Sequence, residues 1–450
     1  MAWLSDEMIE NAGRRFYYGK ADRARAGQMV VDAAAAIARP GQRLVVGPVE
    51  LRRTAYSDAY LYHLLPSLEP GTRYIEMDPG VADRADSGLD REIAAADVDL
   101  VVFVGDYIYT TEVPSYNRVR RHPHRFPDRH ERHTLADYRI HHASYKLDAD
   151  LRACHAAHPW LLVWDDHEVL NGYADDWGDE ERQGKAFMKV RTAAYRAYFE
   201  HMPLLPSRQP QGDSMRMHDH FQWGRLADLW LLDGRQFRTR PPCRGWHDLA
   251  RGNALWRCPQ VEDEARTVLG QEQEDWLAAG LAGSERAWKL VLQPTQMAPG
   301  IVPTPVGEVR YTDGWDAFPA ARARLMSAIA QPRVQDVVLL GGDVHRHVAA
   351  RLRLDPTDPQ SPVVASEFVT SSITSKGLSE FVDMLVRRYN PDLLHMRSDE
   401  RGYVRLDITP EQLQCTFRAT AHPVKPGASL HTQSVWVVDR GQPGPRRQAR

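Results

Sequence analysis

Short apolar runs alternate with amphipathic segments through the middle of the chain. Such runs, bounded by turn residues, are typical of buried strands. They read VDLVVFV, PWLLVW, LADLWLLD, WKLVLQ and VQDVVLLG. Amphipathic helices are expected between them, at about 134–156, 182–200, 260–283 and 318–330. After residue 345 the pattern becomes rich in strands, with one helix near 376–390. Because crossover helices join parallel strands that are covered on both faces, this order predicts an α/β fold.

The first part of the chain follows another pattern. Helices are expected over 5–14 and 27–38, followed by short extended pieces between 43 and 77. We interpret residues 1–85 as a small, partly β N-terminal module. A polar, glycine-containing segment separates it from a larger domain over 91–445.

The charge balance argues against an extended nucleic-acid surface. The chain carries 57 Lys and Arg against 60 Asp and Glu, a formal charge of −3 at pH 7, whereas a wide phosphate-binding surface shows as a basic excess. No apolar run approaches the ~20 residues of a membrane-spanning helix. Arg14 and Arg15 resemble part of a twin-arginine signal, but Asp22 and Arg23 interrupt the apolar stretch that should follow. We therefore expect a cytoplasmic protein. The sequence does not determine its oligomeric state.

The four cysteines are too few and too scattered for a disulfide framework or a zinc cluster. Only Cys243 and Cys258 are placed to pair, since both belong to one predicted loop. The sequence leaves a disulfide and two free thiols open, because the outcome depends on the redox compartment.

Polar residues follow three of the predicted strands at their carboxyl ends, where ligands of α/β sheets collect. The first strand runs into GDYIY, which places the carboxylate of Asp106 three residues before the phenol of Tyr109. These oxygens suit a hard cation. A lone Gly-Asp pair is more often a structural turn, so the interpretation depends on the other strand ends.

The second strand end carries the strongest signal. Asp165, Asp166, His167 and Glu168 follow it directly, and Asn171 comes shortly after. Adjacent acids at a buried strand end are costly unless a cation compensates their charge. This cluster therefore indicates a metal site.

The last of these strands leads into GGDVHRH, which contains Asp343, His345 and His347. Strand alternation would put these three side chains on one face. A single histidine at this place would be explained as a core residue whose hydrogen bonds are made within the protein. Because three strand ends each offer oxygen or imidazole ligands, the sequence predicts a polynuclear metal centre rather than a purely structural carboxylate network.

A two-metal centre favours phosphoester hydrolysis by a metal-bound hydroxide, since paired metals clamp the oxygens of an in-line displacement. Asp106 is the expected bridging carboxylate, and His167 the expected proton donor to the leaving alkoxide. Arg235 follows the third strand, where its guanidinium is placed to bind two phosphate oxygens. An ion pair between Arg235 and Asp233 is an equal alternative.

Eight ordered blocks between about residue 91 and the C-terminus resemble the alkaline phosphatase D (PhoD) family. They are GDYIY, TLADYRIHHASYK, HPWLLVWDDHEVLN, LDGRQFR, LGQEQEDWL, WDAFPAAR, GGDVHRH and SEFVTSSITS. The resemblance implies a metallophosphoesterase-type α/β sandwich, phosphomonoesterase and phosphodiesterase activity, and a mixed iron and calcium centre. By the matching motifs it implies metal ligation by Asp106, Tyr109, Asp165, Asp166, Asn171, Asp343 and His345. It leaves open which of Asp165 and Asp166 binds directly.

The chain departs from the family upstream of these blocks. Family members usually carry a full β-sandwich domain and then a Ser-Cys-Gln type motif, whose Cys and a nearby Tyr help to hold a ferric ion. The matching position here falls near Pro79, where only Asp78 and Asp83 offer oxygen. A shell of carboxylate, amide and imidazole prefers divalent cations. We expect calcium with manganese, zinc or ferrous iron, and a weak ferric site unless the Tyr109 phenolate supports one.

Two functions are weighed. The first is a metal-dependent phosphohydrolase acting on a small phosphoester. The second is a catalytically degenerate phosphate- or nucleotide-binding protein with the same fold. The acid cluster 165–168 favours the enzyme, because it would burden folding without metal, whereas the missing upstream ligands favour the binding protein.

The basic segment 118–133 is interpreted as a polar loop that raises the capture rate of anionic substrate. We expect kcat/KM to fall with added salt more steeply than kcat, because salt screens the attraction between loop and substrate. The measurement is hydrolysis across a salt series, before and after replacing Arg120, Arg121 and Arg125 with Ala. Equal salt sensitivity in the two proteins would contradict this role.

Overall fold

The structure of the protein is a computed structural model. The residues that it describes are 2–3, 43–45, 73–74, 89–109, 133–146, 148–178, 182–243, 248–249, 254–305, 307–422 and 428–448. The helices expected over 5–14 and 27–38 lie outside them, as does the basic loop apart from its last residue, His133. Three short strands of the expected N-terminal module pair in parallel. They are β1 (Ala2–Trp3), β2 (Arg43–Val45) and β3 (Arg73–Tyr74). The division into two domains stays a prediction.

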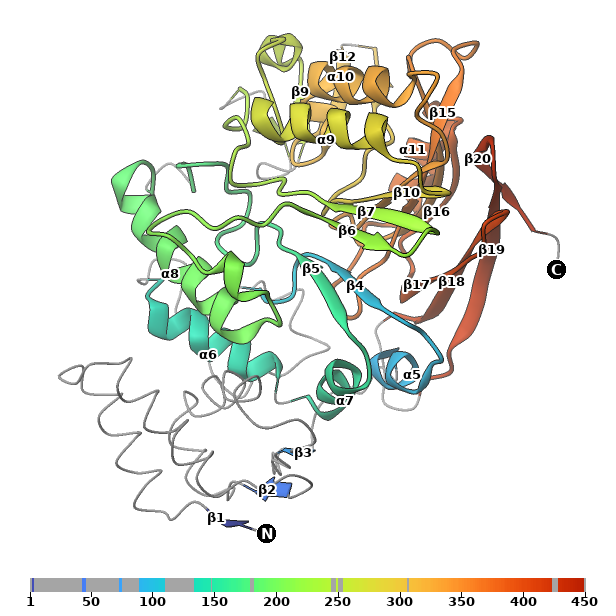
Figure 1. The fold of residues 1–450 in the computed structure, drawn as a ribbon. Coiled ribbons are helices and arrows are strands. Elements are labelled where there is room, and N and C mark those ends of the chain that lie inside the picture. Colours follow the sequence, from blue (N-terminus) through green and yellow to red (C-terminus); the bar gives the residue numbers. More distant parts are fainter. Residues whose placement is uncertain are drawn as a thin grey trace.

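A seven-stranded mixed sheet of order β16-β14-β15-β13-β10-β7-β6 forms the centre of the larger part (Figure 1). Its strands are β6 (Asp219–Trp223), β7 (Ala227–Leu231), β10 (Trp288–Leu292), β13 (Val337–Gly341), β14 (His347–Arg353), β15 (Val363–Val369) and β16 (Leu393–Arg397). β7, β10, β13 and β15 run parallel, whereas β6 and β14 pair antiparallel with β7 and β15. The carboxyl ends of the parallel strands therefore share one edge.

Alternate residues of these strands serve two cores, because successive strand side chains point to opposite faces. Trp230 and Leu339 pack into the core beneath helices α9 (Gln271–Gly283) and α10 (Pro319–Ile329). Leu231 and Leu340 pack into the core on the other face. This two-sided burial explains why the runs are apolar without interruption.

A second, antiparallel sheet covers that other face. It contains β17 (Glu400–Ile408), β18 (Gln412–Ala421), β19 (His431–Asp439) and β20 (Gln442–Arg447). A parallel pair, β4 (Val101–Val104) and β5 (Trp160–Val163), contributes Val163 and Val104 to the same inner core. Two sheets facing across one core make an α/β sandwich.

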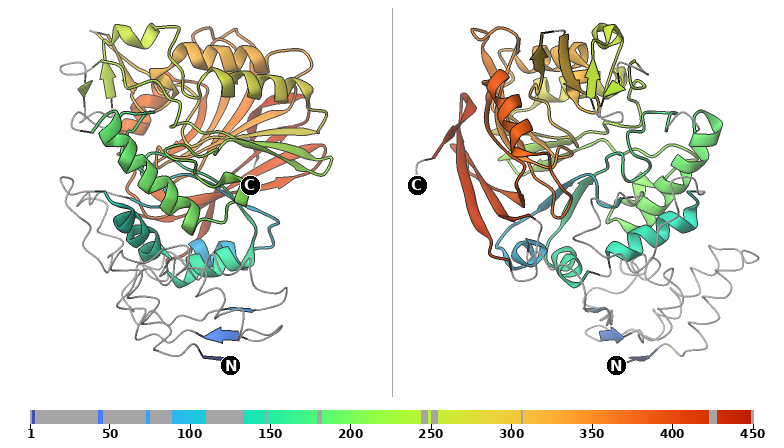
Figure 2. Two further views of the ribbon diagram at one scale, coloured as in Figure 1. Left: turned by 60° about the vertical axis from the view of Figure 1, so that its left-hand side comes forward. Right: turned by 180° about the vertical axis from the view of Figure 1, so that it is seen from behind.

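Helices enclose this sandwich on its outer sides. Besides α9 and α10 they are α5 (Leu89–Ala95), α6 (Leu135–Tyr145), α7 (Ala149–Ala157), α8 (Lys185–His201) and α11 (Glu380–Tyr389), with short 3-10 turns η2 (Pro206–Arg208), η5 (Pro259–Glu262) and η6 (Trp315–Ala317). Figure 2 shows α6 and α8 on the opposite side of β4 and β5 from the C-terminal sheet. Among the described residues, no helix is both long and apolar enough to cross a membrane.

Two of the expected helices are divided. The predicted helix 134–156 is α6 followed by α7, because the Asp148 side chain caps a new helix by accepting from the backbone N–H groups of Asp150 and Leu151. The predicted helix 260–283 is η5 followed by α9. It is interrupted where Gly270 adopts a φ of 76° and Thr267 Oγ1 accepts from the Gly270 N–H.

A small accessory sheet of order β11-β12-β9-β8 stands beside the central one. Its strands are β8 (Asp248–Leu249), β9 (Ala254–Trp256), β11 (Val302–Thr304) and β12 (Gly307–Tyr311). Cys243 and Cys258 form a disulfide next to it, with their Cα atoms 5.8 Å apart. The pairing that the sequence left open is therefore a disulfide in this structure, and Cys154 and Cys415 are free and buried.

A buried basic cluster joins α6 to α8. The His142 and His201 rings stack with centroids 5.1 Å apart, and Lys146 Nζ donates to the His201 carbonyl. Burial, together with neighbouring basic groups, lowers the pKa of His142 well below its ordinary value and that of His201 to about 3. Both imidazoles are therefore neutral in the folded protein.

Acid should destabilise the protein through this cluster. Below about pH 6.5 these histidines bind protons in the unfolded chain but not in the folded chain. The unfolding free energy therefore falls with decreasing pH, by about 1.4 kcal/mol per pH unit for each such histidine. We expect His142→Leu, which removes one of these groups, to lose less stability between pH 7 and 5.5 than the wild type does. Urea unfolding at both pH values measures this, and parallel losses would contradict it.

Candidate metal centre

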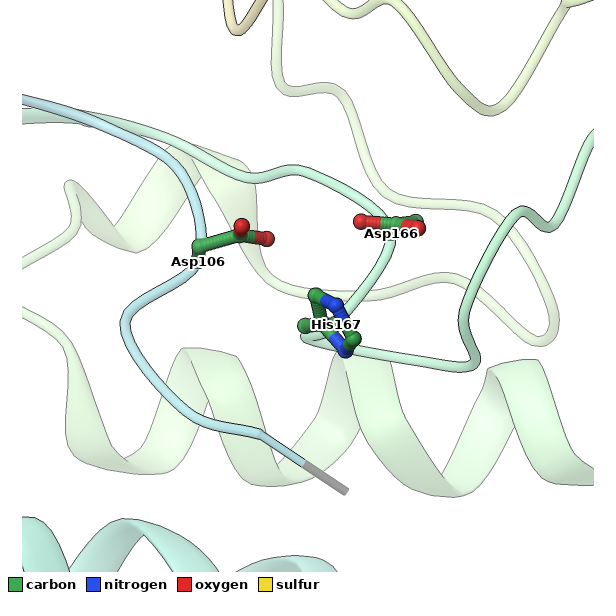
Figure 3. Close-up of side chains that lie close together, drawn as sticks. All are labelled: Asp106, Asp166 and His167. Carbon is green, nitrogen blue, oxygen red and sulfur yellow. The ribbon is translucent and has the colours of Figure 1, made fainter. Parts of the chain in front are cut away.

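Three strand ends bring acidic residues together at one edge of the sheets. Asp106 follows β4, Asp165–Glu168 follow β5, and Asp343 follows β13. Side-chain ligand atoms of Asp106, Asp166 and His167 lie within 4.8 Å of one another, and Figure 3 shows these three residues gathered around a common space. Asp106, Asp165 and Asp343 form a second group of the same kind. Asp106 belongs to both groups.

Several possible ligand atoms of these groups are buried, and their chemistry fits a cation. In the part of the chain that the structure describes, four of them have no hydrogen-bond partner: Asp106 Oδ1, Asp165 Oδ2, Asp166 Oδ1 and His167 Nδ1. Buried polar atoms are nearly always hydrogen-bonded, so unpaired ones call for an ion or water. Carboxylate oxygens and an imidazole are suitable ligands for divalent cations.

The carboxylates also perturb one another. Burial and the neighbouring carboxylates raise the pKa of Asp165 well above its ordinary value, although Arg235 opposes this. Burial, Asp313 and Asp166 raise the pKa of Asp343 to about 7. Burial also opposes ionisation of Asp166, but Arg235 and His167 outweigh it and hold its pKa at about 2. The centre thus carries more negative charge than its own basic side chains offset.

Tyr109 and His345 lie beside the two groups. The Tyr109 hydroxyl is 3.0 Å from Asp106 Oδ2 and 2.8 Å from His345 Nε2, and its ring packs on His167 with centroids 4.0 Å apart. Burial and the Asp106 charge raise the Tyr109 pKa well above its ordinary value. His345 Nε2 is 3.9 Å from Asp106 Oδ2, and its Nδ1 is 2.8 Å from the carbonyl of Lys376. A carbonyl only accepts, so Nδ1 carries a proton.

The turn after β13 corrects one prediction. Asp343, His345 and His347 do not share a strand face, because β13 ends at Gly341 and β14 begins at His347. Asp343 and His345 adopt left-handed backbone conformations, with φ of 62° and 52°. His347 is fully buried and stacks on Phe417 at 4.8 Å, so it belongs to the core.

Glycine is required before Asp106. Gly105 has a φ of 102°, and a Cβ there would lie 2.6 Å from Asp165 Cβ. Asp106 follows with a φ of 59°. The loop after β4 therefore approaches the loop after β5 at a distance that no side chain at residue 105 would allow.

Glu168 fastens these two loops together. Its Oε2 accepts from the N–H groups of Asp106 at 3.0 Å and Asp165 at 2.7 Å, and its Oε1 accepts from those of Tyr107 and Ile108. Burial and Asp106 raise the Glu168 pKa to about 8, while these N–H groups act to lower it. Glu168 thus holds the backbone of Asp106 and belongs to neither ligand group.

Arg235 is fully buried and engaged with carboxylates. Its Nε donates to Asp165 Oδ1, and its Nη1 and Nη2 donate to Asp313 at 2.7 Å each. Asp233 is not its ion-pair partner, since Asp233 Oδ1 accepts from the Arg235 backbone N–H at 3.0 Å. The expected ion pair with Asp233 is therefore replaced by pairs with Asp165 and Asp313, and contact of Arg235 with phosphate stays a prediction.

The sequence missed two site residues. Tyr311 donates to Asp343 Oδ2 at 3.0 Å, and Asp313 pairs with Arg235. Tyr311 ends β12 and Asp313 follows two residues later, in a segment with no acidic cluster or repeated pattern to mark it. Asn171 is exposed in the turn after His167, and its role as a ligand stays a prediction.

Comparison with known proteins identifies the class. The sequence model of the family described as PhoD-like phosphatase matches residues 88–417. This chain belongs to the PhoD-like phosphatase family.

Two relatives are close in sequence or structure. Alkaline phosphatase D of Bacillus subtilis (strain 168) is 37% identical over 366 residues, which cover 79% of this chain and 60% of that protein. The chain thus spans about 60% of the length of that relative. A solved structure described as "Structure of PhoD" matches with a TM-score of 0.73 and 33% identity, covering 82% of this chain and 69% of that chain. The resemblance and the α/β fold expected from the sequence are confirmed.

Replacing Glu168 tests its hold on both loops. In Glu168→Gln one oxygen becomes an NH₂ group facing two backbone N–H groups, so we expect a loss of about 1–3 kcal/mol in unfolding free energy. We also expect metal to bind about 10–100-fold more weakly, as when residues that orient ligands are lost. Urea unfolding and Mn²⁺ titration measure the two effects.

Glu367 provides the matched control. It is a fully buried carboxylate that accepts from the N–H groups of Met297 and Ala298, away from both ligand groups. Glu367→Gln should therefore lower stability similarly but leave Mn²⁺ affinity near that of the wild type. Equal effects of the two substitutions on Mn²⁺ affinity would contradict the assignment.

Proposed function

We propose that the protein is a metal-dependent phosphoric ester hydrolase of the alkaline phosphatase D type, acting on small phosphomonoesters and phosphodiesters. The observation that carries the proposal is the Asp106 carboxylate, which is shared by two groups of possible metal ligands. Membership in the PhoD-like phosphatase family supports the same chemistry.

In this proposal Asp106 would be shared by two metal ions. Asp166 and His167 would help to hold one, and Asp165 and Asp343 the other, with Tyr109 and Asn171 as further candidates. Calcium together with manganese, zinc or iron suits these donors, and a ferric ion would depend on the Tyr109 phenolate. When bound, such ions would supply a water of lowered pKa as nucleophile and positive charge for the phosphate oxygens.

His345 is the better placed proton donor to the leaving group. Its Nδ1 donates to the Lys376 carbonyl, which can only accept, and its Nε2 faces the Tyr109 hydroxyl. The 2.8 Å between Nε2 and that hydroxyl, which itself lies 3.0 Å from Asp106, places His345 within proton-transfer reach of the site. His167, which the sequence proposed for this role, lies among the ligand atoms instead. Because a metal-bound imidazole nitrogen is unavailable as an acid, we assign the donor role to His345.

Arg235 in this scheme orients ligands. Its guanidinium is fully buried against Asp165 and Asp313, and its Nη2 is 3.7 Å from Asp166 Oδ1. It offsets part of the negative charge of the site in either state of metal binding. A direct contact with phosphate would require it to give up Asp313.

Two substitutions test the proposed function. Asp106→Asn removes the shared charge, and His345→Ala removes the proton donor, so each should lower kcat for a chromogenic phosphodiester by about 10²-fold or more while leaving the fold intact. Asp355→Asn, in a surface turn where the Asp355 carboxylate accepts from Thr357, is the control. Chelation should abolish activity, and added divalent metal should restore it.

The outcomes separate the two functions. Turnover near that of the wild type in either variant would overturn its site assignment. A wild-type protein that binds metal and phosphate but hydrolyses neither a monoester nor a diester would instead establish the degenerate binding protein.

A further inference from the structure

The end of β12 contacts the second ligand group from outside the central sheet. Tyr311 is the last residue of this strand, and Asp313 follows two residues later. We call residues 311–313 the β12 tip. Its strand pairs with β9, and the Cys243–Cys258 disulfide anchors the chain two residues beyond β9. The β12 tip is thus held by the accessory sheet.

Asp313 gathers two buried arginines. Its carboxylate accepts from Arg235 Nη1 and Nη2 at 2.7 Å each and from Arg238 Nη1 at 2.7 Å. Arg238 Nη1 also donates to the Asp313 backbone carbonyl at 2.8 Å. A two-bond arginine–carboxylate pair fixes the plane of the guanidinium as well as its position.

That plane decides which carboxylate oxygens Arg235 reaches. Only its Nε donates to Asp165, through Oδ1, while Asp165 Oδ2 and Asp166 Oδ1 have no hydrogen-bond partner among the described residues. A guanidinium without Asp313 would be free to turn its two Nη groups toward these oxygens, since Nη2 is already 3.7 Å from Asp166. Such a rotation would neutralise the oxygens that the metal needs.

Tyr311, at the start of the β12 tip, contacts the possible metal ligand Asp343. Tyr311 donates to Asp343 at 3.0 Å, and Thr295 Oγ1 donates to the same Asp343 oxygen at 2.8 Å. These two donors set the orientation of a carboxylate whose backbone lies in the left-handed region. The β12 tip therefore touches a residue of the second ligand group directly and another through Arg235.

We propose that Asp313 is a positioning residue of the metal centre, which holds Arg235 so that Asp165 Oδ2 and Asp166 Oδ1 stay available to metal. This inference rests on the proposed function, because it requires that metal binds at these carboxylates. It assigns the accessory sheet a task that the strand-end motifs do not include.

The test measures metal affinity in the full chain. Metal-depleted protein is titrated calorimetrically with Mn²⁺ alone, and kcat and KM are measured on the reloaded protein. We expect Asp313→Asn to weaken Mn²⁺ binding about 10–100-fold, as for other residues that orient ligands. Asp313→Glu, which keeps the charge, should recover part of the loss. Asp316→Asn is the matched control, because Asp316 is a buried acid of the next turn that pairs with Arg322 at 2.7 Å and does not contact the site.

A double substitution shows whether Asp313 acts through Arg235. In an Arg235→Lys background, where the two-bond pair is already lost, Asp313→Asn should change Mn²⁺ affinity by no more than about twofold. Wild-type affinity in Asp313→Asn, or a loss matched by Asp316→Asn, would overturn the inference while the proposed function stands. A wild-type chain that binds no Mn²⁺ would overturn both.

Discussion

Repulsion among buried carboxylates is the constraint around which this structure is built. Asp106, Asp165, Asp166 and Asp343 converge from three strand ends, and Arg235 is the cation that contacts two of them. Gathering ionised carboxylates away from water costs several kcal/mol for each uncompensated charge. Their altered pKa values show this cost, because Asp165 and Asp343 resist ionisation. Bound cations would remove the cost, so metal binding and the stability of this edge are expected to be coupled.

The surrounding structure holds the backbone at this edge in unfavourable conformations. Asp106, Asp343 and His345 are left-handed, which is uncommon for residues other than glycine. Buried carboxylates outside the ligand groups secure the neighbouring loops by accepting backbone N–H groups. Glu168 does so for the loops after β4 and β5, and Glu367 does so for the loop after β10. The possible metal ligands therefore differ in role from Glu168, the acid beside them that fixes the chain.

The buried strands of the fold and the sheet edge where the acidic residues meet could be predicted from sequence. Uninterrupted apolar runs marked strands that are buried on both faces, and the polar residues after them marked the edge where Asp106, Asp165 and Asp343 meet. The direction of side chains after β13 could not be predicted, because the turn into β14 replaces strand alternation with left-handed backbone. Asp313 could not be predicted either. It reaches the site through the accessory sheet, and no local pattern records that contact.

The contacts of Arg235 illustrate the same limit. Its position after β7 was clear from the sequence, but its partners come from residues 70 and 78 positions away in the chain. Local spacing suggested Asp233, two residues before it, whose carboxylate in fact accepts backbone N–H groups. Tertiary packing decides which charged residues pair in a buried site. A single sequence indicates such pairs only where they belong to a known family motif.

Anomalous diffraction from crystals soaked in Mn²⁺ would test the central claim most directly, because it locates the metal independently of activity. The account predicts two peaks, one on each side of the Asp106 carboxylate, with Asp166 and His167 at one and Asp165 and Asp343 at the other. Peaks that do not contact Asp106, or a single peak served by only one of the two groups, would contradict a shared carboxylate as the basis of the site.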